Sequence, residues 1–114
     1  MYRILIVDDE AKIREVLAEY AEFEGFASDQ AADGMEAVNK CKNEDYDLIL
    51  MDIRMPGING YEAAERIRAM KRSDADIPII AMTANVYEED IERAKRAGMN
   101  DHLAKPMDSG KLLA

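Results

Sequence analysis

Three aspartates follow directly after short apolar runs, and their placement indicates chemistry. Asp8 and Asp9 come after Ile4–Val7, and Asp52 comes after Leu48–Met51. If both runs are parallel strands, these carboxylates meet at one edge of a sheet, where ligands bind in such folds. Carboxylates held within a few ångströms repel one another and are costly to keep together without a cation. The spacing therefore predicts a cation site.

A hydroxyl and an ammonium group complete this set. Thr83 ends the apolar run 77–82, and Lys105 follows residues 101–104. Mg²⁺ prefers a few carboxylates, waters and phosphate oxygens as ligands. The hydroxyl and the ammonium group would hold the other oxygens of a tetrahedral anion. The set predicts a Mg²⁺-assisted phosphoryl site in which one carboxylate acts as nucleophile.

Each member also has a structural interpretation. Asp9 could cap the helix that follows it, and Asp52 could be a turn residue before the Pro/Gly-rich loop. Thr83 and Lys105 could be an ordinary strand end and a solvated lysine. Their joint placement at consecutive strand ends favours the functional interpretation.

The elements that must position these residues alternate between strands and helices. Short continuous apolar runs predict buried strands, and apolar residues recurring every three or four positions predict amphipathic helices. Strands are expected at 4–7, about 26–31, 48–51, 77–83 and about 101–104. Helices are expected up to Gly25, after Gly34, after Gly60, from the N-cap Asn85 to Gly98, and at the end of the chain, where the last helix is truncated.

This alternation predicts an α/β fold with a five-stranded parallel sheet. The first, third and fourth strands are the most apolar, so they belong in the interior of the sheet. The order 2-1-3-4-5 satisfies this condition with right-handed crossovers and is the doubly wound, flavodoxin-like arrangement. Residues 1–114 are expected to form a single domain.

Composition excludes several classes of protein. The 114 residues carry 15 Lys plus Arg and 24 Asp plus Glu, for a net charge of −9, which disfavours nucleic-acid binding by this domain. No apolar run approaches the length of a membrane span, so no membrane contact is expected. The only cysteine, Cys41, is interpreted as a core residue, and a lone thiol fits the cytoplasm. The only histidine, His102, is interpreted as a partly exposed edge-strand residue.

Four stretches carry a resemblance to a known family. They are Ile6–Glu10, Met51–Pro56, Met82–Asn85 and Asp101–Pro106. Together they resemble the receiver domain of response regulators in bacterial two-component signalling, over nearly the whole chain. The stretch from Met82 onward looks more specifically like the receiver of a hybrid sensor histidine kinase.

The resemblance implies a phosphorelay function. Asp52 would accept a phosphoryl group from a phosphohistidine, while Asp9, Asp52 and the main-chain carbonyl of Arg54 bind Mg²⁺ and Asp8 assists through water. Thr83 would bind one phosphoryl oxygen and Lys105 another. Such a domain is not a conventional enzyme, since it catalyses its own phosphorylation and dephosphorylation.

The resemblance also implies how the signal is passed on. Thr83 and His102 occupy the switch positions, and Arg54 and Asn85 occupy the positions that tune phosphoryl lifetime. The Lys105–Pro106 bond is expected to be cis. Phosphorylation would remodel the face formed by the fourth helix, the fifth strand and the fifth helix.

The implied partners are a histidine kinase or histidine phosphotransfer domain and a downstream output domain or protein. Two other functions stay open from the residues alone. One is a small Mg²⁺-dependent phosphatase of the aspartyl-phosphate type, although Arg54 stands where such enzymes usually have a second acid. The other is an interaction module that works without phosphorylation.

Overall fold

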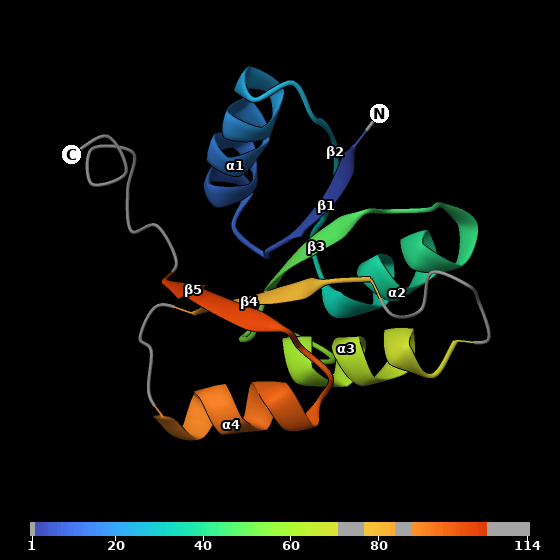
Figure 1. Ribbon diagram of the computed structural model, residues 1–114, viewed down its shortest axis with the longest axis vertical. Helices are drawn as coiled ribbons and strands as arrows, with labels where there is room; N and C mark the ends of the chain where they lie inside the picture. Colours follow the sequence, from blue (N-terminus) through green and yellow to red (C-terminus); the bar gives the residue numbers. More distant parts are fainter. Residues whose placement is uncertain (1, 71–76, 84–87, 105–114) are drawn as a thin grey trace.

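The computed structural model describes residues 2–70, 77–83 and 88–104 and shows strands alternating with helices (Figure 1). The strands are β1 (Arg3–Val7), β2 (Ala27–Ala31), β3 (Leu48–Asp52), β4 (Ile79–Thr83) and β5 (Asp101–Ala104). The helices are α1 (Ala11–Phe23), α2 (Gly34–Asn43), α3 (Gly60–Arg68) and α4 (Glu88–Arg96). None of these helices is long and apolar enough to cross a membrane.

The five strands form one parallel sheet in the order β2-β1-β3-β4-β5. This is the predicted order, with the three most apolar strands inside. β4 begins at Ile79, two residues later than expected from the apolar run. Pro78 accepts a hydrogen bond from the Ile49 N–H at 3.0 Å but has no N–H of its own to donate, and β4 begins at the next residue.

The two faces of the sheet carry different layers of helix (Figure 1). Side chains alternate between the faces, because successive residues of a strand point in opposite directions. Ile4 and Ile6 pack with Ala21 of α1 in a small cluster. Leu5 and Val7 belong to the main core, which also holds side chains of α2, α3 and α4. The sheet is therefore covered on both sides, as a doubly wound fold requires.

The helix ends follow the sequence signals. Gly25 has φ of 84° and directly follows the C-cap of α1, which favours glycine. Asp33 caps α2 by accepting a hydrogen bond from the Glu36 N–H, and Asn59 caps α3 in the same way. Cys41 is buried in α2, as predicted. The predicted N-cap Asn85 and the predicted last helix lie outside the described residues.

Candidate phosphoryl-transfer site

The strand register brings the predicted site residues to one edge. Val7 of β1 lies opposite Met51 of β3, so Asp8 and Asp52 each stand one position further along neighbouring strands. Asp52 in turn lies opposite Met82 of β4, which puts Thr83 one position beyond it. Three adjacent strands therefore deliver a polar side chain to the same edge of the sheet.

Burial separates these three side chains from the rest of the described chain. Asp8 is 0% exposed, Asp52 2% and Thr83 8%, and they are the only polar or charged residues classed as buried in residues 2–70, 77–83 and 89–104. Burying a carboxylate costs free energy unless a cation or hydrogen bonds compensate. A sequence chosen for stability alone would place apolar residues here.

The first acidic run forms a compact set of oxygen ligands. Asp8, Asp9 and Glu10 each offer a carboxylate oxygen, and the three oxygens lie within 4.8 Å of one another. Hard oxygen donors at this spacing fit Mg²⁺, which uses few protein carboxylates and keeps several waters. Glu10 was not a predicted ligand, and its signal was only its position directly after the two aspartates.

Local hydrogen bonds fix this run. Asp8 accepts a hydrogen bond from the Glu10 N–H at 2.8 Å, and Arg14 of α1 donates to the main-chain oxygen of Asp8 at 2.7 Å. The N-cap of α1 is Glu10, without a side-chain cap. The alternative interpretation of Asp9 as the cap is therefore wrong, because α1 begins one residue later than that interpretation requires.

The loop after β3 is held against the strand end. The Ile53 N–H donates to Met82 O at 3.1 Å, and the Gly60 N–H donates to Ile53 O at 2.8 Å. A Cβ on Gly60 would lie 2.9 Å from the Ile53 Cα and still closer to the Asp52 main-chain oxygen. Only glycine allows this approach. Arg54 follows at the start of the loop and is exposed.

A family comparison decides the class of protein. The family model described as the response regulator receiver domain matches residues 4–114. This chain belongs to the response regulator receiver family. The order of the sheet and the buried polar residues at its edge agree with that assignment.

Two curated relatives are longer than this chain. The transcriptional regulatory protein ResD of Bacillus subtilis is 43% identical over 104 residues, 91% of this chain and 42% of ResD. The CAI-1 autoinducer sensor kinase/phosphatase CqsS of Vibrio cholerae is 39% identical over 111 residues, 97% of this chain and 16% of CqsS. The chain thus spans less than half the length of either relative.

Two solved structures share the fold. The receiver domain of the sensor histidine kinase PA1611 from Pseudomonas aeruginosa, crystallised with a magnesium ion in its active site cleft, is 39% identical with a TM-score of 0.82, and the match covers 98% of this chain and 91% of that one. The receiver domain of Ssk1 from Saccharomyces cerevisiae, in a co-crystal with the histidine phosphotransfer protein Ypd1, is 29% identical with a TM-score of 0.84, covering 98% and 83%.

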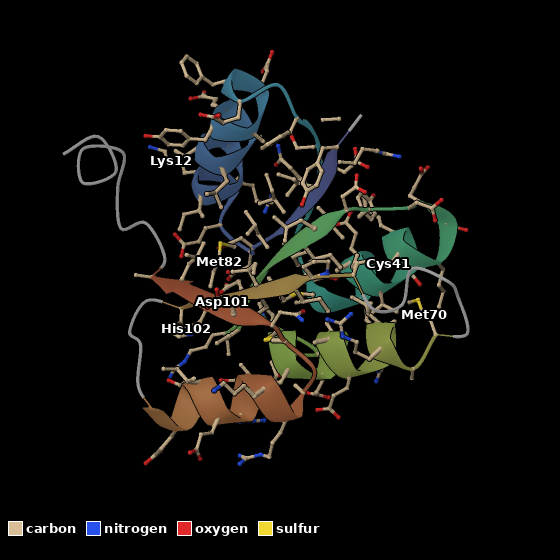
Figure 2. All side chains as sticks on the ribbon, in the orientation of Figure 1. Lys12, Cys41, Met70, Met82, Asp101 and His102 are labelled. Atoms are coloured by element: carbon tan, nitrogen blue, oxygen red, sulfur yellow. The ribbon has the colours of Figure 1, made fainter. Side chains whose placement is uncertain are left out.

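The two residues predicted to be switch positions, Thr83 and His102, lie on neighbouring strands. His102 of β5 is opposite Ala81 of β4, two residues before Thr83. Residues two apart on a strand point to the same face, so Thr83 and His102 share a face of the sheet. The His102 side chain is 35% exposed, which confirms its predicted partial exposure. Figure 2 labels His102 on β5. Asn85, Lys105 and the predicted cis bond to Pro106 lie outside the described residues.

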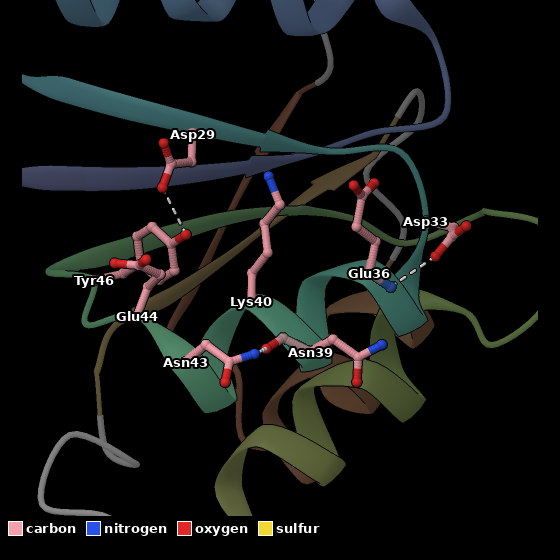
Figure 3. Close-up of a pocket in the computed structure, with 8 residues that line it drawn as sticks. All are labelled: Asp29, Asp33, Glu36, Asn39, Lys40, Asn43, Glu44 and Tyr46. Carbon is pink, nitrogen blue, oxygen red and sulfur yellow. Dashed lines mark hydrogen bonds between the residues drawn. The ribbon is translucent and has the colours of Figure 1, made fainter.

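A second acidic region lies beside β2 and α2. Figure 3 shows this pocket, which has a volume of about 550 Å³. Its lining residues are Asp29, Asp33, Glu36, Asn39, Lys40, Asn43, Glu44 and Tyr46. The amino-acid sequence does not predict this pocket, because its acids come from separate elements and carry no shared spacing.

Proposed function

We propose that this receiver accepts a phosphoryl group on Asp52. The observation that carries the proposal is the burial of Asp8, Asp52 and Thr83 at the ends of three adjacent strands. A carboxylate oxygen of Asp52 attacks the phosphorus of a phosphohistidine, so that a P–O bond forms and the P–N bond breaks. The imidazole nitrogen leaves with the bonding electron pair, and the product is an acyl phosphate.

The remaining residues hold the reacting group. Asp9, Asp52 and the main-chain carbonyl of Arg54 would hold Mg²⁺, and Asp8 would assist through water. When bound, Mg²⁺ neutralises charge on the phosphoryl oxygens. The Thr83 hydroxyl donates a hydrogen bond to one phosphoryl oxygen, and Lys105 pairs with another. The compact carboxylates of the acidic run and the magnesium ion in the PA1611 receiver support this assignment.

The phosphodonor is a histidine kinase or a histidine phosphotransfer domain, and the acceptor of the signal is an output domain or protein. The Ssk1 receiver in complex with a phosphotransfer protein supports the first partner. We place this receiver in a hybrid sensor histidine kinase, in line with its similarity to CqsS and PA1611. The flanking sequence tests that placement: a kinase core upstream supports it, and a DNA-binding domain downstream contradicts it.

Intact-protein mass spectrometry tests the phosphorylation. The receiver is incubated with phosphoramidate in Mg²⁺ or in chelator. We expect one added phosphoryl group in Mg²⁺ and none in chelator. Asp52→Asn should abolish the addition, while Asp29→Asn, which changes an acid outside the site, should retain it. Equal labelling of Asp52→Asn and the parent would contradict the assignment.

A further inference from the structure

The start of α3 touches the backbone of the proposed phosphorylation residue. Gly60 donates its N–H to Ile53 O, and its missing side chain lets α3 approach the Asp52 main-chain oxygen. Closely packed groups cannot move independently. A shift of the backbone at Asp52 and Ile53 must therefore move the first turn of α3.

Tyr61, the next residue, reaches from α3 to α4. Its side chain is buried, with 3% of the residue exposed. The hydroxyl oxygen lies 3.4 Å from both the main-chain oxygen and Oδ1 of Asp90. The guanidinium carbon of Arg93 lies 4.4 Å from the ring centre, in a cation–π contact. Two residues of α4, one turn apart, thus contact the same side chain.

A cavity of about 550 Å³ lies between the loop after β3 and α4, beside this tyrosine. Its lining comprises Ile53, Arg54, Met55, Pro56, Asn59, Tyr61, Asp90 and Arg93. Burial and then Asp90 raise the pKa of the Tyr61 phenol, while Arg93 and Arg54 act in the opposite direction. Charges of both the loop and α4 therefore act on one phenol, and the cavity leaves room for loop and helix to change their separation.

We propose that Tyr61 is a positioning residue that couples the state of Asp52 to the position of α4. The proposal rests on the proposed function, since Asp52 must change its state. The path runs from the Asp52 backbone through Gly60 to Tyr61, and from there to Asp90 and Arg93. The contacts of the hydroxyl with Asp90 are long and therefore weak, so α4 can break them and shift to another position at a low cost in free energy. A bound phosphoryl group biases that choice through the first turn of α3.

Hydrogen exchange of α4 tests the coupling. Exchange of residues 88–96 is measured in Mg²⁺ with and without beryllofluoride, which mimics the phosphoryl group. In the parent we expect beryllofluoride to change α4 exchange. Tyr61→Phe, which removes only the hydroxyl, should shrink that change by about fivefold or more. Tyr46→Phe is the matched control, because it removes a phenol on the far side of the domain and should leave the change intact.

A merely structural role gives a different result. If Tyr61→Phe raises α4 exchange equally with and without beryllofluoride, the coupling is overturned. Asp90→Asn keeps the side-chain acceptor oxygen and should preserve the ligand-dependent change, whereas Asp90→Ala leaves only the main-chain oxygen and should reduce it. A reduction by both variants alike would contradict the role of this acceptor.

Calorimetric titration separates this proposal from the proposed function. If beryllofluoride binds the parent and Tyr61→Phe with equal affinity and changes α4 exchange equally in both, the coupling through Tyr61 is overturned, while the phosphoryl site stands. Failure of the parent to bind beryllofluoride in Mg²⁺ contradicts the phosphoryl site, and the coupling falls with it.

Discussion

Two acidic regions of this receiver use the same residue types in opposite ways. Beside β2, Asp29 accepts hydrogen bonds from Arg3 Nη2 and the Tyr46 hydroxyl, both at 2.7 Å, and Glu44 pairs with the same arginine at 3.0 Å. Arg3, Asp29 and Glu44 are partly exposed, whereas Tyr46 is buried, and their contacts hold β1, β2 and the end of α2 together. At the carboxyl end of the sheet, Asp8 and Asp52 are buried, and Asp8 lies close to Asp9 and Glu10.

The difference shows what a charge contributes in each setting. Partly exposed pairs gain little Coulomb energy in water, yet their geometry fixes neighbouring elements. Buried carboxylates that crowd one another destabilise the fold until a cation or donated hydrogen bonds compensate their charge. Buried acids that lower the stability of the fold and lie at one edge of the sheet therefore indicate a functional site.

The largest loss of stability is expected at Gly60, where α3 packs tightly against the main chain of Asp52. Gly60→Ala should destabilise the receiver by at least about 2 kcal/mol, because the new methyl group would overlap the Asp52 main-chain oxygen. Gly57→Ala is the control in the same loop. A Cβ at position 57 would meet no atom within 4 Å. Holding alanine at the φ of 78° found there should lower the free energy of unfolding by only about 1 kcal/mol. Urea unfolding measures both, and equal losses would contradict the close packing.

The two acidic regions should respond with opposite signs to loss of one charge. Without metal, Asp52→Asn should raise the free energy of unfolding by about 1–3 kcal/mol, because it relieves carboxylate repulsion. Asp29→Asn should lower the melting temperature, because it weakens the bonds to Arg3 and Tyr46. Thermal unfolding in chelator tests this contrast, and a lower melting temperature for Asp52→Asn would break it.

A smaller effect is expected from the phenol of the second region. Tyr46→Phe should cost about 1 kcal/mol at neutral pH through the lost hydrogen bond to Asp29. Burial, followed by the bond to Asp29, raises the pKa of Tyr46 above its ordinary value. The stability from this shift is complete below the unfolded pKa of about 10 and is lost as pH rises above it.

The parent should therefore lose stability more steeply than Tyr46→Phe above pH of about 10, and the two should converge. Urea midpoints measured from neutral to alkaline pH test this expectation. Parallel curves would show that Tyr46 does not contribute through its ionisation.

The order of the sheet and the placement of Asp8, Asp52 and Thr83 followed from sequence because both depend on local patterns. Apolar runs define the strands, and parallel strands bring their carboxyl ends to one edge. The family resemblance predicted roles that the local patterns leave open, such as a switch position for His102.

Other features depend on how elements cross in space. The contact of Tyr61 with α4 needs the relative position of two helices, which no spacing in the sequence encodes. Glu10 joins the acidic cluster because the chain turns into α1 at that residue, and the same turn excludes Asp9 as the cap. The pocket beside β2 likewise gathers residues from separate elements.

The most direct test of the central claim is to locate the phosphoryl group. The receiver is phosphorylated in Mg²⁺, and the acyl phosphate is reduced with borohydride, which converts the modified aspartate to homoserine. Peptide mapping should then find homoserine at position 52 and at no other acid. Homoserine at position 8, 9 or 29, or none in a sample that carries phosphate, would contradict the account.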